Sequence, residues 1–307
     1  MKKKVLITGG TGFIGYHLIK RCIELKMDVT CISSKPIRKL NFFRKVKYKI
    51  CDLGNLSRLK RIIIRDYDFV VNLAGNIDHN NKKKTYSSHY LGVKNLYEVL
   101  KLKNIKKFIQ IGSSSEYGKF FGKVKETDNC DPKMIYGRSK LKSSNFLIKK
   151  FKKENFPVLI LRFFQVYGPR QKKNRLIPFV IDSSLRNINF HCSEGSQFRD
   201  FLYVDDAINA IIKSLNFSVR SNGKIINIGY GKPIKVKDLI LMIQNIIKKG
   251  KPVFGKLKLR VDESKKIYPN LERSKRILNW KHKISLKEGL KKTVKFYNNR
   301  ISKKKRV

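Results

Sequence analysis

Residues 4–15 have the sequence KVLITGGTGFIG, in which a short apolar run leads into three glycines with G-x-x-G-x-x-G spacing. From Phe13 to Leu25, apolar residues recur at helical intervals. We therefore predict a strand, a tight turn and a helix, the setting in which a glycine motif binds a dinucleotide; a plain βα turn is the alternative. We expect Gly9 to permit the turn and Gly12 to let a pyrophosphate approach the backbone. Gly15 would let the helix pack closely on the strand.

The composition of the 307-residue chain fits a globular protein, because 41% of its residues are hydrophobic. No apolar stretch reaches the roughly 20 residues that cross a bilayer, and glycines interrupt the first apolar run too early for a secretory signal. The five cysteines are scattered, and the five histidines lack the spacing of metal ligands. We therefore expect a cytoplasmic protein with no membrane span, no disulfide framework and no metal site.

The chain is strongly basic, since 71 Lys and Arg residues against 22 Asp and Glu give a formal net charge of +49. Such a charge raises the question of nucleic-acid binding. The lysines are spread along the whole sequence, however, with no basic helix that carries interleaved aromatics. We therefore expect no specific nucleic-acid partner, and the positive field would instead attract an anionic substrate such as a diphosphate.

Apolar strands alternate with helical segments through the first half of the chain. This alternation predicts an α/β fold with a Rossmann-type doubly wound parallel sheet. The expected strands are Lys4–Thr8, Asp28–Ser33, Val46–Cys51, Phe69–Leu73, Phe108–Ser113 and Val158–Phe163. The expected helices lie near Phe13–Leu25, Asn55–Ile64, Ser87–Leu102 and Tyr136–Lys153.

After about residue 165 this rhythm changes. Gly168–Leu202 is rich in loop residues and contains Pro169 and Pro178. The following segments favour a helix, a strand and a second helix, over Tyr203–Leu215, Lys224–Ile228 and Val236–Lys248.

Tyr136 and Lys140 lie four residues apart and share one face of a predicted helix. A nearby ammonium favours the phenolate, so we expect Lys140 to lower the pKa of Tyr136 and make it an acid/base group near neutral pH. Taken alone, this spacing also fits an ordinary amphipathic helix. Earlier in the chain, however, Ser113 ends a predicted strand, where functional groups of a parallel sheet gather. Ser113 is therefore placed to hydrogen-bond the reacting oxygen.

Together these features resemble the extended short-chain dehydrogenases/reductases, in the group of NAD(P)-dependent nucleotide-sugar epimerases and dehydratases. The resemblance covers nearly the whole chain. Besides the glycine motif and the Ser113 loop, it rests on Cys51-Asp52-Leu53, Asn72-Leu73-Ala74-Gly75, Tyr136/Lys140, the segment RFFQVYGPR over 162–170, the segment RDFLYVDD over 199–206, Leu278-Asn279-Trp280 and Ser285-Leu286.

The resemblance implies hydride transfer between a nicotinamide and a sugar carbon. Tyr136 would be the acid/base, Lys140 its electrostatic partner and ribose ligand, and Ser113 the group that orients the carbonyl. The nucleotide-diphosphate sugar would contact Ser114, Gln165, Arg199 and Arg260; for Arg199, a salt bridge to Asp200 or Asp205 is the alternative. The cofactor would be held by Gly9, Gly12, Phe13, Ile14, Gly15, Ser34, Lys35, Arg38, Asp52, Leu53, Leu73, Ala74, Gly75, Tyr136 and Lys140.

The resemblance also implies a division of the chain. The dinucleotide-binding domain would cover residues 1–165 and be rejoined by about 203–228. A smaller C-terminal α/β substrate-binding lobe would comprise 166–202 and 229–300, followed by a frayed basic tail over 301–307. A homodimer would form through the helices Ser87–Leu102 and Tyr136–Lys153.

The sequence departs from the pattern of the group in several places. No carboxylate follows the second strand, where NAD-preferring members usually carry one, and Ser34, Lys35 and Arg38 could hold a 2′-phosphate instead; NADP is therefore slightly favoured over NAD. Ser114 and Ser115 stand where dehydratases place an acid pair, with Glu116 displaced by one residue, so 4,6-dehydration is not expected. Gln165 and His89 each replace a more usual asparagine.

These departures favour a reductase that acts on a 4-keto sugar with NADPH. A nucleotide-sugar 4-epimerase with retained NAD needs the same Ser, Tyr and Lys side chains and is the alternative. A non-catalytic dinucleotide- or RNA-binding protein is the remote alternative, against which the intact Tyr136 and Lys140 argue.

Overall fold

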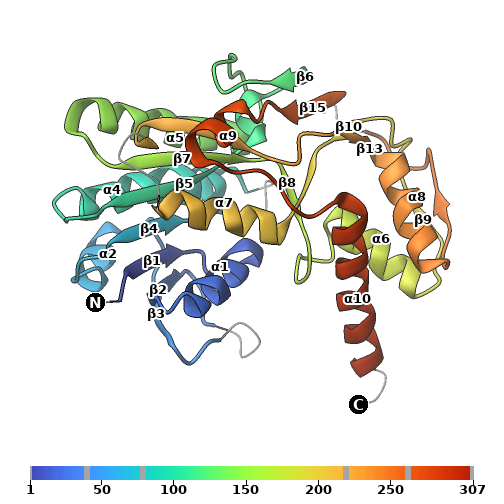
Figure 1. Cartoon of the computed structure of the whole chain (residues 1–307), viewed down its shortest axis with the longest axis horizontal. Helices are drawn as coiled ribbons and strands as arrows, with labels where there is room; N and C mark the ends of the chain where they lie inside the picture. Colours follow the sequence, from blue (N-terminus) through green and yellow to red (C-terminus); the bar gives the residue numbers. More distant parts are fainter. Residues whose placement is uncertain (1, 38–41, 77–80, 217–220, 260–263, 305–307) are drawn as a thin grey trace.

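The computed structural model describes residues 2–37, 42–76, 81–216, 221–259 and 264–304. In this part of the chain, seven parallel strands form one central sheet in the order β12-β7-β5-β4-β1-β2-β3 (Figure 1). The predicted doubly wound α/β fold is confirmed, and the predicted strands differ from the observed ones by at most one residue at either end. The strands are β1 (Lys4–Thr8), β2 (Asp28–Ser33), β3 (Val46–Ile50), β4 (Phe69–Asn72), β5 (Lys107–Ser113), β7 (Val158–Phe163) and β12 (Lys224–Ile228).

Helices cover both faces of this sheet, for a reason that β1 illustrates. Val5 and Ile7 pack in one apolar cluster with side chains of α1 (Phe13–Glu24) and α7 (Val204–Asn216), whereas Leu6 belongs to the cluster on the other face. Alternate side chains of a strand point to opposite faces, so a wholly apolar strand needs a helix layer on each side. The second layer consists of α2 (Leu56–Ile62), α4 (Gly92–Leu100) and α5 (Ile135–Glu154).

The strand order reverses between β1 and β4. The chain passes from β1 outward to β2 and β3, and then returns to β4 on the opposite side of β1. At such a switch point the loops after the two strands diverge and open a crevice at the carboxyl ends of the strands. The glycine motif follows β1 and Leu73–Gly75 follow β4, so the topology brings two predicted cofactor segments to one place.

The segment after β7 contains a helix that the sequence analysis missed. Within the loop-rich stretch Gly168–Leu202, α6 covers Leu176–Leu185. Pro178 lies in its first turn, where a helical residue has no intrahelical acceptor for its N–H, so the proline is compatible with the helix. On either side, β8 (Gln165–Tyr167) pairs with β11 (Phe201–Tyr203) in parallel.

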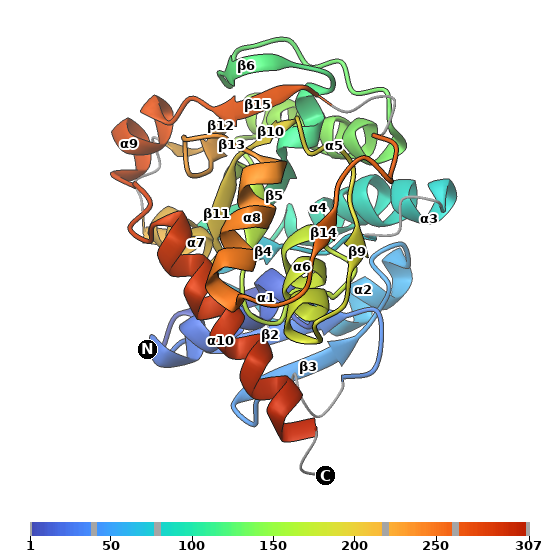
Figure 2. The same cartoon turned by 90° about the vertical axis from the view of Figure 1, so that its right-hand side faces the viewer.

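Beyond the central sheet, α6 packs against α8 (Val236–Ile247), and both helices contact α10 (Leu286–Lys304) (Figure 2). A smaller sheet has the strand order β13-β10-β15-β6. The remaining elements are α3 (Lys82–Tyr86), the π-helix η2 (Ser87–Leu91), the 3-10 helix η3 (Ser114–Tyr117), β6 (Phe121–Val124), β9 (Phe190–His191), β10 (Phe198–Arg199), β13 (Ile234–Lys235), β14 (Pro252–Val253), β15 (Lys266–Pro269) and α9 (Glu272–Leu278).

Two expectations about the chain as a whole can be compared with these elements. The tail over 301–307 was expected to be frayed, but α10 continues to Lys304, and 305–307 lie outside the described residues. Of the helices in the described ranges, none combines the length and the apolar character that crossing a bilayer requires.

Candidate cofactor and active site

The glycine turn between β1 and α1 has the geometry of a phosphate-binding loop. Gly9 has a φ of +69°, and a Cβ there would lie 2.8 Å from the backbone nitrogen of Ala74. A Cβ at Gly15 would collide with the Gly9 carbonyl. A Cβ at Gly12 would approach only that carbonyl, at 3.2 Å, so its other sides are open. Gly9 and Gly15 are thus required by the packing, whereas Gly12 leaves space above the turn.

The start of α1 adds an anion-binding feature to this turn. Gly12 is the N-cap residue and offers no side chain to the free N–H groups of the first turn, which begins with Phe13 and Ile14. Free N–H groups and the positive end of a helix dipole bind phosphate well. The residues present therefore fit the pyrophosphate of a dinucleotide.

The predicted adenosine contacts lie at the ends of β2 and β3. Ser34 and Lys35 are exposed directly after the buried Ser33, whose hydroxyl lies 3.1 Å from that of Thr11 in the glycine turn. Asp52 is exposed and accepts the N–H of Gly54. The neighbouring Leu53 is buried. Arg38 lies outside the described residues.

The edge of the crevice after β4 is fixed by a buried polar contact between strands. The Thr8 hydroxyl donates to Asn72 Oδ1 (2.5 Å), and the Asn72 amide donates to Gln110 Oε1 (2.8 Å) on β5. The same Asn72 oxygen accepts the N–H of Ala74 (3.2 Å). This contact holds the start of the Leu73–Gly75 segment at the switch point.

His89 is a residue beside the site whose contacts the sequence analysis did not foresee. Its Nε2 lies 2.8 Å from the carbonyl oxygen of Asn76, and its ring meets the Tyr136 ring edge-on with centroids 5.0 Å apart. A Cβ at Gly75 would collide with the imidazole, so this position needs glycine. His89 thus links the end of β4 to Tyr136.

The structure brings the three predicted catalytic side chains together. Ser113 is the last residue of β5, and its side chain is near enough to Tyr136 at the start of α5 to oppose the rise in the pKa of that phenol. Lys140 follows one turn later and is buried, with Nζ donating to the Ile111 carbonyl oxygen (2.7 Å). Ser114 is buried directly after Ser113.

The predicted direction of the pKa shift of Tyr136 is wrong. Burial disfavours the phenolate and raises the pKa of Tyr136, and the Ser113 side chain only partly offsets this. Burial also lowers the pKa of Lys140, to about 8. The Lys140 amine donates to a carbonyl of β5. Desolvation is the largest cause of the pKa shift of each of the two side chains.

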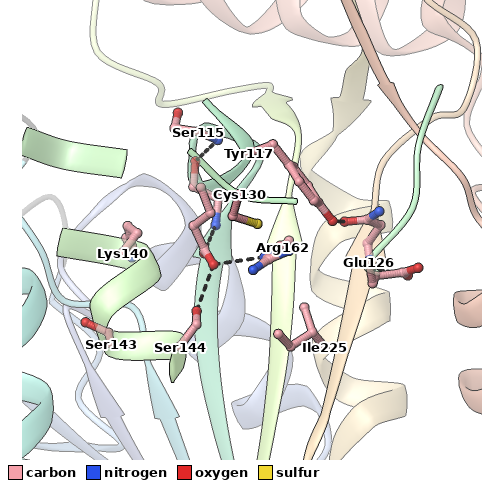
Figure 3. A network of polar contacts seen from close by, with 12 residues as sticks. Ser115, Tyr117, Glu126, Cys130, Lys140, Ser143, Ser144, Arg162 and Ile225 are labelled. Atoms are coloured by element: carbon pink, nitrogen blue, oxygen red, sulfur yellow. Dashed lines mark hydrogen bonds and ion pairs between the residues drawn. The ribbon is translucent and has the colours of Figure 1, made fainter. Parts of the chain in front are cut away.

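Glu116, which stands next to the position of the dehydratase acid pair, is fully buried and forms an ion pair with Arg162 (Nε to Oε2, 2.8 Å) (Figure 3). Its other oxygen accepts the N–H of Ser113 (2.8 Å). The carboxylate is therefore held by partners from β5 and β7.

The predicted substrate residues on β8 and β10 are connected through the backbone. Gln165 is exposed, and its N–H donates to the Asp200 carbonyl. Arg199 is buried, and its Nη1 donates to the carbonyl oxygens of Phe198 and Ser264 (2.7 Å each). The hydroxyl of Ser264 accepts the N–H of Phe120, which joins this region to the loop after η3. Arg260 lies outside the described residues.

The alternative salt bridge of Arg199, to Asp200 or Asp205, is absent from the described part of the chain. The Asp200 carboxylate instead accepts the N–H groups of Tyr230 (2.7 Å) and Gly231 (2.5 Å). Burial raises the pKa of Asp200 to about 7, although these hydrogen bonds oppose the shift. Asp200 thus fixes the loop that follows β12.

The cysteines and the other possible ligands do not form a metal centre in the described ranges, where no three His, Cys, Asp or Glu side chains converge as ligands. All five cysteines are free thiols.

A parallel sheet with a glycine turn at its switch point, and Ser, Tyr and Lys side chains beside that turn, defines the class of extended short-chain dehydrogenases/reductases. The sequence model of one family in this class, described as the NAD dependent epimerase/dehydratase family, matches residues 5–229. The chain belongs to that family.

Similar proteins of this family span almost the same length as the chain. A Methanocaldococcus jannaschii protein named as a candidate UDP-glucose 4-epimerase is 29% identical over 310 residues, which cover 96% of this chain and 98% of that protein. The solved UDP-glucose 4-epimerase of Thermotoga maritima, with UDP-glucose, has a TM-score of 0.91 at 25% identity and covers 97% of this chain and 99% of its own.

A second solved structure is that of the UDP-glucuronic acid 4-epimerase of Bacillus cereus in complex with UDP-glucuronic acid and NAD. It has a TM-score of 0.88 at 27% identity, and the match covers 96% of this chain and 99% of that one. Relatives at similar identity include a mouse dTDP-D-glucose 4,6-dehydratase, 29% identical over 96% of this chain and 88% of its own length. Family membership therefore defines the kind of enzyme and leaves the reaction to the side chains of the site.

Proposed function

We propose that this chain is a 4-epimerase of a nucleoside-diphosphate sugar that uses NAD. The observation that carries the proposal is the placement of Ser113 at the carboxyl end of β5, where its side chain is near enough to Tyr136 at the start of α5 to favour the phenolate. Two neighbouring hydroxyl groups can bind the same sugar oxygen, one as donor and the other as proton acceptor. The names of the Thermotoga maritima and Bacillus cereus epimerases, each solved with a UDP sugar, support the substrate class.

In this proposal, NAD supplies the acceptor and donor of a hydride when it is bound. Gly9, Gly12 and Gly15 with the start of α1 would hold its pyrophosphate. Tyr136 takes the proton of the C4 hydroxyl when that carbon becomes a ketone, and returns it when the alcohol forms again. Ser113 donates to the same oxygen and keeps it at the phenol.

Lys140 has two tasks in this proposal. It contacts the cofactor ribose, and its positive charge favours the phenolate of Tyr136. Arg199 and Gln165 contact the diphosphate and the sugar, and Ser114 lines the pocket beside Ser113. The proton moves only between Tyr136 and the C4 oxygen of the sugar. The proposed reaction therefore needs no second acid/base pair of the kind that a dehydratase uses.

A reductase of a 4-keto sugar is the second candidate function. It is favoured by the exposed Ser34 and Lys35, which follow β2 in the absence of a carboxylate and suit the 2′-phosphate of NADPH. The same site would then deliver one proton from Tyr136 to the ketone and release an oxidised cofactor.

The two functions differ in how the cofactor is held. The first experiment identifies any dinucleotide that is released from the purified protein by denaturation, and then titrates NAD, NADH, NADP and NADPH into the stripped protein. Retained NAD and interconversion of a UDP sugar with its C4 epimer would support the epimerase. An exchangeable site that prefers NADPH and consumes it with a 4-keto nucleotide sugar would refute the epimerase and support the reductase.

The division of the chain is part of the same proposal. Residues 1–165 with about 203–228 would bind the cofactor, and 166–202 with 229–300 would bind the sugar. The parallel pairing of β12 with β7 supports the return of the chain to the first unit, and the cluster of α6, α8 and α10 supports a separate second unit. We place the protein in the cytoplasm, which its free thiols support.

We also propose a homodimer through the helices η2, α4 and α5. The rings of Tyr86 at the end of α3, Tyr90 on η2 and Phe146 on α5 form a contiguous aromatic series, and the Lys142 ammonium lies 4.6 Å from the Tyr90 ring centre. Leu91 is exposed beside them. Light scattering should give the mass of a dimer, and Leu91→Asp should shift it to that of a monomer; a monomeric wild-type protein would refute the proposal.

A further inference from the structure

The carboxylate of Glu116 connects three elements of the fold. Its Oε1 accepts the N–H of Ser113 at the end of β5 (2.8 Å). Its Oε2 accepts the hydroxyl of Ser144 on α5 and the Nε of Arg162 on β7, each at 2.8 Å (Figure 3). Every one of these groups is buried. A displacement of the carboxylate would therefore be transmitted to both sides of the candidate site.

Ser144 lies on the part of α5 that matters for the site. Tyr136, Lys140 and Ser144 follow one another at intervals of four residues, so they share a face of the helix. Lys140 attaches this face to β5 through the Ile111 carbonyl, and Ser144 attaches it through Glu116 and Ser113. These two attachments set how closely Tyr136 approaches Ser113.

We propose that Glu116 is a positioning residue for the Ser113–Tyr136 pair, with Arg162 and Ser144 holding its carboxylate in place. The inference rests on the proposed function in one respect, because it takes that pair to be catalytic. Glu116 itself touches neither substrate nor cofactor; it acts through the backbone of Ser113 and through α5.

Arg162 is matched to this task by its surroundings. It provides the positive charge that pairs with the fully buried Glu116 carboxylate. Its guanidinium lies 4.6 Å from the ring centre of Tyr117, whose hydroxyl donates to Asn227 (2.8 Å). The cation is therefore held from β12 as well as from β7.

Gly112 provides an independent observation. A Cβ at this position would lie 2.5 Å from Glu116 Oε1 and 3.1 Å from Arg162 Cγ. β5 therefore has a residue without a side chain at the point where the Glu116–Arg162 ion pair packs against the strand. The backbone of β5 is fitted to this pair at the residue directly before Ser113.

The test compares Ser144→Ala with Ser139→Ala. Both serines are buried on α5, but the Ser139 hydroxyl has no hydrogen-bond partner among the described residues. Ser144→Ala should increase hydrogen exchange at residues 113–118 and 135–144, and lower kcat about tenfold with KM for the nucleotide sugar unchanged. In Ser144→Thr, which restores the hydroxyl, kcat should be closer to the wild-type value than in Ser144→Ala. Ser139→Ala should change neither measurement.

Equal exchange in the two alanine variants would overturn the positioning role, whatever the activity. Loss of kcat without rescue by threonine would also overturn it, because a packing defect alone explains that result. Absence of nucleotide-sugar turnover in the wild-type protein would refute the proposed function, and hydrogen exchange would then decide the positioning role by itself. Glu116→Gln provides a second variant, in which the exchange of the Ser113 segment should rise further than in Ser144→Ala.

Discussion

The Nζ of Lys140 donates to the carbonyl oxygen of Ile111, two residues before Ser113, at 2.7 Å. The amine is buried, and burial lowers its pKa to about 8. Lys140 is thus an attachment between α5 and β5 as well as a charge beside the phenol. Its protonation state changes within the range of ordinary assay conditions.

This burial has a consequence for stability that can be measured. Below about pH 8 the amine is protonated in both the folded and the unfolded state; between about pH 8 and 10.5 only the unfolded state keeps the proton. The contribution of Lys140 to the free energy of unfolding should therefore rise with pH over this interval. Denaturant unfolding of wild type and Lys140→Met from pH 7 to 10.5 should show a steeper rise with pH in the wild type than in the variant.

Lys107 is the matched control for this experiment. It is a buried lysine at the other end of β5, its Nζ donates to Ser221 (2.7 Å), and burial lowers its pKa to about 8 as well. Lys107→Met should lose a similar share of the pH dependence of stability but keep its turnover. Equal loss of turnover in both variants would show that turnover depends on either buried amine beside β5, and would contradict the role of Lys140 in the site.

Tyr136→Phe should keep the fold and the affinity for cofactor but lose most turnover. The phenol hydroxyl is the group beside Ser113, and its removal takes away the path of the proton. The rate should fall by at least about tenfold, in line with the loss of a general acid/base. Steady-state kinetics with a cofactor-binding titration measure both quantities. A variant that keeps more than about a tenth of the wild-type rate would mean that another group moves the proton.

The glycines of the turn should separate stability from cofactor binding. At Gly12 an added methyl group meets only one carbonyl, whereas at Gly15 it collides with the turn. Gly12→Ala should keep the melting temperature of the stripped protein and weaken dinucleotide binding about tenfold or more, since the methyl group occupies the approach to the backbone. Gly15→Ala should lower the melting temperature by several degrees, consistent with an overpacking cost of about 1–3 kcal/mol. The reverse order would refute the assignment of Gly12 to the pyrophosphate.

Arg199→Ala should mainly raise KM for the nucleotide sugar, with a smaller effect on kcat. The guanidinium is buried between the Phe198 and Ser264 carbonyls and would face the diphosphate. Arg273→Ala is a suitable control, because this arginine also donates to a backbone carbonyl, that of Ile225, and has no role in the proposed site. An unchanged KM in Arg199→Ala would make Arg199 a structural residue.

The sequence was most informative where one physical rule acts alone. Buried parallel strands are mostly apolar, so β1, β2 and β7 could be placed to the residue. The helix α6 was missed because a proline was taken as a break, although the first turn of a helix accepts it. Local patterns thus predict helices and strands well, except where the effect of a residue on the helix depends on its position in that helix.

The site shows the same limit in its electrostatics. The spacing of Tyr136 and Lys140 predicts that they share a helix face. The direction of the pKa shift of Tyr136 depends on how deeply the side chain is buried, which the spacing of residues in the sequence does not reveal. Glu116 had a usable signal, since Ser113 and Glu116 form a capping box with the S-x-x-E pattern around η3. Its ion pair with Arg162, 46 residues later, is a tertiary contact that this pattern does not reveal.

The pairing of β12 with β7 has a consequence for the synthesis of the chain. β7 is buried along its whole length, and one of its edges is covered by residues 224–228, more than 60 positions downstream. A ribosome-bound chain that ends before Lys224 therefore exposes an apolar strand edge, together with the guanidinium of Arg162 that β12 helps to enclose through Asn227. Every nascent copy passes through this aggregation-prone interval, and its length is set by the translation time between β7 and β12.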